Sequence, residues 1–300
     1  MLGNFDETVS VKDFLHHADT GIGTCAGLDG EAVFEDGVAY KATADGKVIV
    51  MKPEDGVAFG TVAKFDESVP AVELRGIADI EAMKKTLAPY VEGNQNIFYM
   101  IKATGEFKAM HVRSCFASQK PYPTLSEVAK NQREFHFANT YGTVIAVWCP
   151  RYVNGINLPG WHFHYLSGDK TQGGHILGLS ADHLTLKINQ IERFDLTLPR
   201  NPEFARRDLC EDLSAKTAAV EGVKKYSGIS FLKYIHAKRT GMQTRASPFC
   251  VQHLLSAAQS LLFVLTVMYD HTHRVRLRLE RHTAAAANSV PDVAAVLVFL

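Results

Sequence analysis

The chain of 300 residues carries no net charge, because 32 lysine and arginine residues balance 32 aspartate and glutamate residues. A balanced chain lacks the excess of basic residues that binds phosphates, so we expect no nucleic-acid partner. Its five cysteines are odd in number and scattered, and no two have the spacing CxxC. This pattern argues against a disulfide framework and favours a reduced, cytoplasmic protein with free thiols.

Long apolar runs are also missing. The most apolar stretch, 254–269, has 16 residues and contains two serines, a glutamine and a threonine, whereas a membrane span needs about 20 mostly apolar residues. The N-terminus, MLGNFDETVSVKDF, lacks the basic region and apolar run of a secretory signal. Neither a phosphate-binding loop nor a dinucleotide fingerprint is present. We therefore expect no membrane partner and no nucleotide cofactor.

The chain does contain many short segments of alternating apolar residues separated by glycine-containing turns, which predict strands. The glycine-rich segment 21–31 predicts tight turns or close backbone approach. Strands are expected at 32–34, 38–41, 47–51, 59–65, 97–103, 106–113, 134–138, 141–149, 160–167, 175–179, 184–190 and 192–198, with a hairpin turn at Thr104–Gly105. Helices are expected at 9–17, 79–87, 124–130 and 203–220. The fold class is therefore α/β and β-rich, with two mixed sheets and a few helices.

Three histidines stand out in the stretch 161–175, WHFHYLSGDKTQGGH. His162 and His164 alternate along a predicted strand, so their imidazoles point to the same face. Gly173-Gly174 allows a sharp turn that brings His175 close to them. Two histidines one residue apart are often ordinary surface residues, and the third behind the turn strengthens the metal hypothesis. Three converging imidazoles suit a zinc-type site with open positions for substrate, although they also bind other divalent ions.

Several sequence blocks, in this order, resemble the acetolactate decarboxylase family over roughly residues 4–225. The blocks are GIGTCAGLDGE (21–31), ADGKV (44–48), HVRSC (111–115), KPYPTLSEVAKNQ (120–132), GWHFHYLSGDKTQGGHILG (160–178) and AVEG (219–222). Each block alone is a weak signal, whereas six in the same order make a strong one. The resemblance implies a two-domain α/β subunit, commonly a homodimer, that converts (S)-2-acetolactate to (R)-acetoin and CO2.

The resemblance also implies a set of functional residues. The family's zinc ligands correspond to His162, His164 and His175, and its active-site arginine corresponds to Arg113. Its two functional glutamates correspond to Glu31 and Glu221, and Thr24 occupies a position that lines the family's site. The implied cofactor is Zn²⁺ and the implied partner is the small molecule 2-acetolactate. The implied domains are an N-terminal β-rich domain (1–115) and a C-terminal metal-binding domain (116–226), followed by an extension (227–300).

The chemistry of the residues is consistent with these assignments but leaves some roles open. The fork of donors on Arg113 suits a carboxylate, yet the same group suits assistance in protonation. Glu31 and Glu221 are each candidates for proton donor or additional metal ligand. Without the resemblance, all three would be read as ordinary surface charges. His111 and His136 are read as hydrogen-bonded strand histidines, and Cys25 and Cys115 as small buried residues.

Two alternatives remain. One is a different zinc-dependent lyase or hydrolase on a similar scaffold. The other is an inactive homologue, because the chain begins later than the family does and the segment after Tyr226 has no counterpart in it. A second pair of spaced histidines, His271 and His273, lies among arginines that would repel a cation. The pathway also remains open between acetoin and butanediol formation and the supply of branched-chain amino acids.

Overall fold

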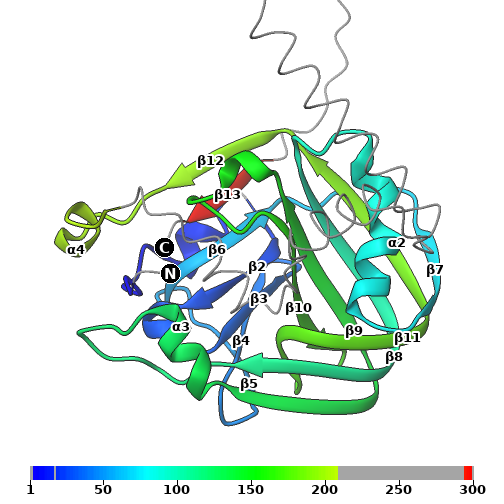
Figure 1. Ribbon diagram of the computed structural model, residues 1–300, viewed down its shortest axis with the longest axis horizontal. Helices are drawn as coiled ribbons and strands as arrows, with labels where there is room; N and C mark the ends of the chain where they lie inside the picture. Colours follow the sequence, from blue (N-terminus) through cyan, green and yellow to red (C-terminus); the bar gives the residue numbers. More distant parts are fainter. Residues whose placement is uncertain (1–2, 17, 209–293, 299–300) are drawn as a thin grey trace, which may run out of the picture. The chain divides into compact units, whose positions relative to one another are not determined.

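The computed structural model describes residues 3–16 and 18–208 and the backbone of residues 294–298 (Figure 1). All of these residues belong to one compact unit. Strands dominate, and they form two sheets, called sheet A and sheet B here. The predicted β-rich fold with two sheets and few helices is confirmed.

Sheet A contains most of the N-terminal strands. Its strands are β1 (Val9–Ser10), β2 (Thr20–Cys25), β3 (Glu31–Glu35), β4 (Val38–Ala42), β5 (Val48–Val50), β6 (Gly56–Ala63), β12 (Arg193–Thr197) and β13 (Ala294–Val298). They lie in the order β12-β13-β6-β2-β3-β4-β5, and β1 pairs with β6. The pairing of β12 with β13 is parallel and the other pairings are antiparallel, so sheet A is mixed.

The glycine-rich segment 21–31 is half strand and half turn. Its first part lies in β2, which the sequence did not predict, although close backbone approach was expected correctly. A Cβ atom on Gly21 would lie 2.1 Å from the carbonyl oxygen of Thr61. Its second part turns through the short 3-10 helix η1 (Ala26–Leu28) into β3. The glycines of β2 therefore let this strand run close to its neighbour β6.

Sheet B carries the three predicted metal ligands, His162, His164 and His175. Its strands are β7 (Val72–Ile77), β8 (Phe98–Ser114), β9 (Arg133–Cys149), β10 (Gly160–Ser167) and β11 (Gly173–Ile191). They follow the order β10-β9-β8-β11-β7, and β10 also pairs with β11, which closes β10, β9, β8 and β11 into a ring. Its pairings are all antiparallel. The expectation of a mixed sheet therefore holds for sheet A alone.

Three predicted interruptions of strands in sheet B are wrong. The hairpin at Thr104–Gly105 does not exist, because β8 runs straight through these residues between β9 and β11. The predicted strands 134–138 and 141–149 are one strand, β9, and 175–179 and 184–190 are one strand, β11. Pairing along both edges of β8 keeps it extended where the local sequence favours a turn. β7 was not predicted either.

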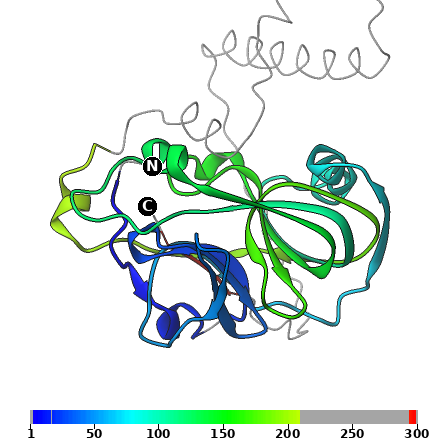
Figure 2. The same cartoon turned by 90° about the horizontal axis from the view of Figure 1, so that it is seen from below.

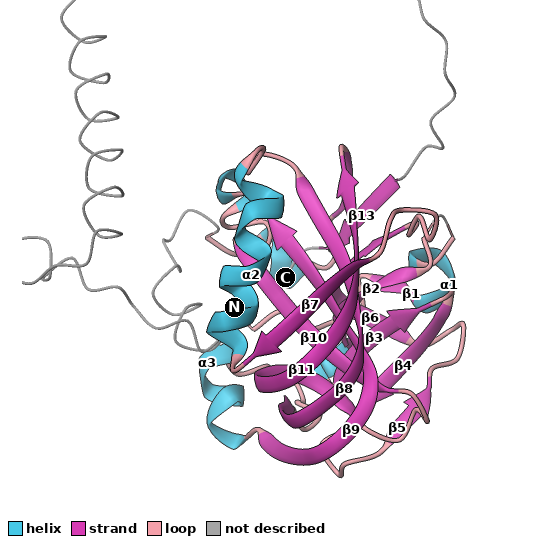
Figure 3. Ribbon diagram, turned by 90° about the vertical axis from the view of Figure 1, so that its right-hand side faces the viewer, coloured by secondary structure: helices cyan, strands magenta, loops and turns pink. Residues whose placement is uncertain are grey.

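Helices occupy few of the described residues. They are α1 (Val11–Phe14), α2 (Ile80–Glu92), α3 (Leu125–Val128) and α4 (Pro202–Ala205), with the further 3-10 helices η2 (Ala129–Asn131) and η3 (Arg151–Val153). The side chain of Asp79 caps α2 by accepting a hydrogen bond from the Ala82 amide. Met83, Leu87 and Val91 recur every four residues and are buried. α2 contacts β7 and β11 through this face (Figure 3).

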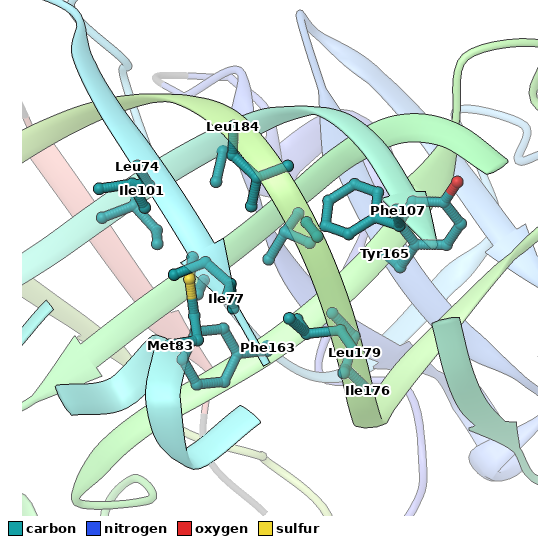
Figure 4. Close-up of a cluster of buried hydrophobic side chains, with 14 of the residues drawn as sticks. Leu74, Ile77, Met83, Ile101, Phe107, Phe163, Tyr165, Ile176, Leu179 and Leu184 are labelled. Atoms are coloured by element: carbon teal, nitrogen blue, oxygen red, sulfur yellow. The ribbon is translucent and has the colours of Figure 1, made fainter. Parts of the chain in front are cut away.

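The core of sheet B lies inside its ring of strands. Phe163 and Tyr165 of β10 point into it, where they meet buried residues of β8 and β11. Met83 of α2 lies beside Phe163 and Ile77 (Figure 4). The side chains of β10 alternate, so His162 and His164 point out of the ring.

A second core joins the ring to sheet A. It contains Ile22 and Val33 of sheet A and Ile145, Val147 and Leu166 of sheet B. The Ser114 hydroxyl also donates a hydrogen bond to the Ala42 carbonyl at 2.7 Å, which ties β8 to β4. Figure 2 shows the N-terminal strands of sheet A, in blue, against the green strands of sheet B. One outer face of the ring is thus covered by sheet A.

Some predictions extend beyond the described residues. The helix expected at 203–220 begins as α4, and its remainder from residue 209 onward lies outside them. The division at residue 115 stays a prediction, although β7 and β8 precede that residue and pair in the sheet that carries the histidines. None of the helices in the described part has both the length and the apolar character needed to cross a bilayer.

Candidate metal centre

The three predicted metal ligands lie together where the ring of sheet B closes. His162 and His164 come from β10, and His175 comes from β11 as the direct cross-strand neighbour of His164. Nε2 of His162 lies 2.9 Å from Nδ1 of His175 and 3.2 Å from Nε2 of His164. Tetrahedral zinc with bonds of about 2.0–2.1 Å holds nitrogen ligands roughly 3.3 Å apart. The two separations are thus close to the value that one shared ion requires, and all three ligand atoms lie within 4.8 Å of one another.

Burial keeps these imidazoles neutral. His164 and His175 are buried and His162 is half-buried. Desolvation, and then the positive charge of Arg113, lowers the pKa of His162 to about 3. Desolvation also lowers the pKa of His164 and of His175 well below the usual value. Neutral imidazoles are the form that binds a metal ion.

Sheet A fixes the tautomer of His164. Its Nδ1 lies 2.9 Å from the carbonyl oxygen of Ala32 in β3. Because a carbonyl oxygen only accepts hydrogen bonds, Nδ1 must carry the proton, and Nε2 presents its lone pair to the other two histidines. Backbone carbonyls commonly orient metal-binding histidines in this way.

Glu31 approaches the cluster from sheet A. It is buried, and its Oε2 lies 3.6 Å from Nε2 of His164. The preceding turn sets its position, since Gly30 has φ +92° and a Cβ there would lie 2.6 Å from the carbonyl oxygen of Ala42. The hydroxyl of Thr24 donates to the carbonyl of Gly30 at 2.8 Å. Thr24 therefore braces the turn that presents Glu31.

Arg113 lies beside His175 as its cross-strand neighbour on β8. Its side chain is buried, with 3% of its surface exposed. Nη1 of Arg113 donates a hydrogen bond to Oε1 of Gln132 at 3.0 Å, and Nε2 of Gln132 donates to Oε1 of Glu134 at 2.9 Å. A buried guanidinium next to neutral imidazoles is suited to bind an anionic group.

The structure brings together most of the predicted site. The three histidines, Glu31 and Arg113 lie around one point, with Thr24 behind Glu31. Glu221 lies outside the described residues. Sequence reasoning missed Gln132 as the partner of Arg113. Gln132 closes one of the blocks quoted above, but a single glutamine has no chemical signature that would have marked it.

Comparison with known proteins identifies the family. The family model described as alpha-acetolactate decarboxylase matches residues 1–211. An alpha-acetolactate decarboxylase of Brevibacillus brevis is 35% identical over 225 residues, which cover 75% of this chain and 78% of that protein. One of Lactococcus lactis is 33% identical over 210 residues, which cover 70% and 88%. The chain belongs to the alpha-acetolactate decarboxylase family.

A solved structure agrees with this result. The crystal structure of alpha-acetolactate decarboxylase from Bacillus subtilis aligns with a TM-score of 0.69 and 28% identity, covering 73% of this chain and 93% of that one. The predicted membership in the acetolactate decarboxylase family is confirmed. The part matched by the family model contains all three histidines, Glu31 and Arg113.

Proposed function

We propose that this chain converts (S)-2-acetolactate to (R)-acetoin and CO2 at a Zn²⁺ ion held by His162, His164 and His175. The observation that carries the proposal is the convergence of three neutral imidazoles beside a buried arginine. Three protein ligands leave room for substrate, as catalytic zinc sites require. Family membership supports the choice of reaction.

The reaction breaks the bond between C1 and C2 of the substrate, and the electron pair moves toward the C3 carbonyl to give an enediolate. A proton added to the enediolate then completes acetoin. When bound, Zn²⁺ supplies a Lewis acid that stabilises the negative charge developing on the substrate oxygens. The substrate's own ketone accepts the electrons, so the reaction requires no organic cofactor.

Arg113 binds and orients the substrate carboxylate in this proposal. Its guanidinium presents paired donors that match the two carboxylate oxygens. Gln132 accepts from Nη1 and thereby limits the directions in which the side chain can turn. Burial excludes water from the guanidinium, which strengthens its attraction for an anion.

Glu31 delivers the proton to the enediolate in this proposal. Within the part of the chain that the structure describes, its carboxyl group approaches the three histidines, with Oε2 3.6 Å from Nε2 of His164. Its fixed place on β3 provides one face for protonation, as a stereospecific product requires. Glu221 stays the second candidate for this role. Thr24 holds Glu31 in place through Gly30.

Acetoin formation from racemic acetolactate tests the proposal, measured before and after chelation and again after Zn²⁺ is restored. Chelation and His162→Ala should each abolish acetoin formation, and Glu31→Gln should reduce it by about 10²- to 10⁴-fold. His183→Ala is the matched control, because His183 is an exposed strand histidine paired with Glu73. A folded, zinc-loaded wild-type protein that releases no acetoin would overturn the proposal. Hydrolysis of esters or amides would then indicate the alternative zinc hydrolase.

A cytoplasmic homodimer remains our expectation for the assembled protein. Size-exclusion chromatography with light scattering measures the assembly directly.

A further inference from the structure

A second group of metal-binding side chains lies on the outer surface of sheet B. It consists of His111 of β8 and of Glu134 and His136 of β9, called the outer cluster here. His111 and His136 are direct cross-strand neighbours, and Glu134 lies two residues before His136 on the same face. The candidate ligand atoms of the three side chains all lie within 4.8 Å of one another. Two rigid, paired strands therefore hold three donors together without any loop.

Inside the outer cluster, a hydrogen bond occupies the place where a metal ion would bind. Nε2 of His111 lies 2.8 Å from Oε2 of Glu134, close enough to share one hydrogen. A zinc ion bonded to both atoms needs a separation of roughly 3.3 Å. The ion can thus replace the shared hydrogen after a shift of about half an ångström. The rings of His111 and His136 stack at 4.0 Å with an angle of 16° between their planes.

Stacked rings cannot both point their lone pairs at one ion, so one ring has to turn. Exposure makes this turn possible. Glu134 and His136 are exposed and the side chain of His111 keeps 30% of its surface accessible. The neighbour of His111 on β11 is Gly178, which places no side chain beside the ring. Rotation of an exposed imidazole about its terminal torsion costs little, because that torsion has broad minima.

The carboxylate of the outer cluster is held in its ionised form. Hydrogen bonds from Gln132 and then from His111 lower the pKa of Glu134. Gln132 occupies Oε1 and leaves Oε2 directed at His111. An ionised carboxylate and two imidazoles form the ligand set that suits Zn²⁺, Ni²⁺ and Cu²⁺, whereas Mg²⁺ and Ca²⁺ prefer oxygen ligands.

We propose that His111, Glu134 and His136 form a second binding site for a divalent transition-metal ion, separate from the site at His162, His164 and His175. Water completes the coordination of this ion, because the cluster faces solvent. The outer site binds more weakly than the inner one, since its ligands must give up water and one ring must turn. The proposal is independent of the reaction proposed above, because it depends only on these three side chains.

Protection of single histidines from chemical modification tests the proposal in the full chain. The protein is stripped with a chelator, supplied with one equivalent of Zn²⁺ and treated with diethylpyrocarbonate. Modification at each histidine is then measured by peptide mass spectrometry while Zn²⁺ is raised. We expect the modification of His111 and His136 to fall together, at Zn²⁺ concentrations at which His183 stays reactive. Because the readout is specific for each residue, histidines elsewhere in the chain do not disturb it.

His183 is the matched control because it is an exposed strand histidine paired with a single glutamate, with 49% of its side chain accessible. Glu134→Gln retains the size of the side chain and an oxygen that can accept from Gln132, but it removes the charge and one of the two accepting oxygens, and should abolish the protection of both histidines. His111→Ala should abolish the protection of His136. Equal protection of His183, or unchanged protection of His136 in either variant, would overturn the proposal.

Discussion

The two histidine clusters of sheet B are built alike but differ in their surroundings. The inner cluster contains the cross-strand pair His164 and His175, and the outer cluster contains the pair His111 and His136. A single row of paired residues joins them across four strands, and the row runs through His164, His175, Arg113 and Glu134. Directly paired residues share a face of the sheet, so both clusters lie on the same side.

The two clusters differ in burial, because sheet A covers only the inner one. β3 places Ala32 and Glu31 against His164, which has no exposed surface. Among the described residues, no such strand covers Glu134 or His136, which are exposed. Strand pairing therefore supplies proximity in both places, and the second sheet supplies burial in one. Burial changes the pKa of an imidazole and the strength of the charges near it.

The largest expected difference between the clusters is the response of the metal-free protein to acid. Unfolded histidines take up protons below about pH 6.5, whereas folded His162 stays neutral down to about pH 3. Unfolding therefore binds protons in this range, and the free energy of unfolding falls as pH falls from 6.5 toward 3. The slope is up to about 1.4 kcal/mol per pH unit for each such group.

Urea unfolding of chelated protein between pH 5 and pH 8 measures this slope. His162→Ala should flatten it, and Asn131→Ala, which removes no titratable group from an exposed position, should leave it unchanged. Equal slopes in the wild type and His162→Ala would contradict the assigned difference in burial.

The next expected effect concerns the arginine in the middle of the row. Arg113→Lys keeps the charge but loses the paired donors, and loss of a charge-assisted hydrogen bond costs about 1.5–3 kcal/mol, roughly a 10- to 150-fold fall in kcat/KM for acetolactate. Arg75→Lys is the control, since Arg75 is exposed on β7 of the same sheet. A loss of less than about threefold would remove Arg113 from carboxylate binding.

The smallest effect is expected at Gln132, which connects Arg113 to Glu134 of the outer cluster. Gln132→Ala removes one hydrogen bond to Arg113, worth about 0.5–1.5 kcal/mol, or roughly a 2- to 12-fold fall in kcat/KM. Asn131→Ala, at the exposed preceding residue, should have no effect. An unchanged melting temperature in Gln132→Ala would assign the loss to the position of Arg113. An unchanged kcat/KM would show that Arg113 needs no support from Gln132.

The sequence predicted the parts of this site that depend on local periodicity. Alternation along 160–167 placed His162 and His164 on one face, and β10 has these bounds. The sharp turn expected at Gly173-Gly174 is wrong, because these glycines begin β11 and the chain reverses in residues 168–172 instead. The family resemblance added Glu31 and Arg113, which no local pattern would have selected.

Strand pairing and burial could not be predicted in the same way. Thr104–Gly105 has the composition of a turn, but β8 is held extended by partners on both edges. His111 and His136 are 25 positions apart in the sequence and meet only through the register of β8 and β9. The carbonyl of Ala32 that orients His164 likewise comes from another sheet. These features depend on contacts between distant segments, which single-sequence patterns do not contain.

The closure of the ring has a consequence for metal exchange. β8 and β11 pair from Phe98 to Arg113, whereas β10 and β11 join only through 164–166 and 173–175. Within the ring, local opening is easiest at the strand pairing with the fewest backbone hydrogen bonds, which is that of β10 with β11. His164 lies on one strand of this pair and His175 on the other. An ion bound by both histidines would cross-link β10 and β11 and oppose this opening. The rate of metal release would then equal the rate at which the β10–β11 pairing opens. Amide hydrogen exchange at Tyr165 and Gly174 would occur at the same rate.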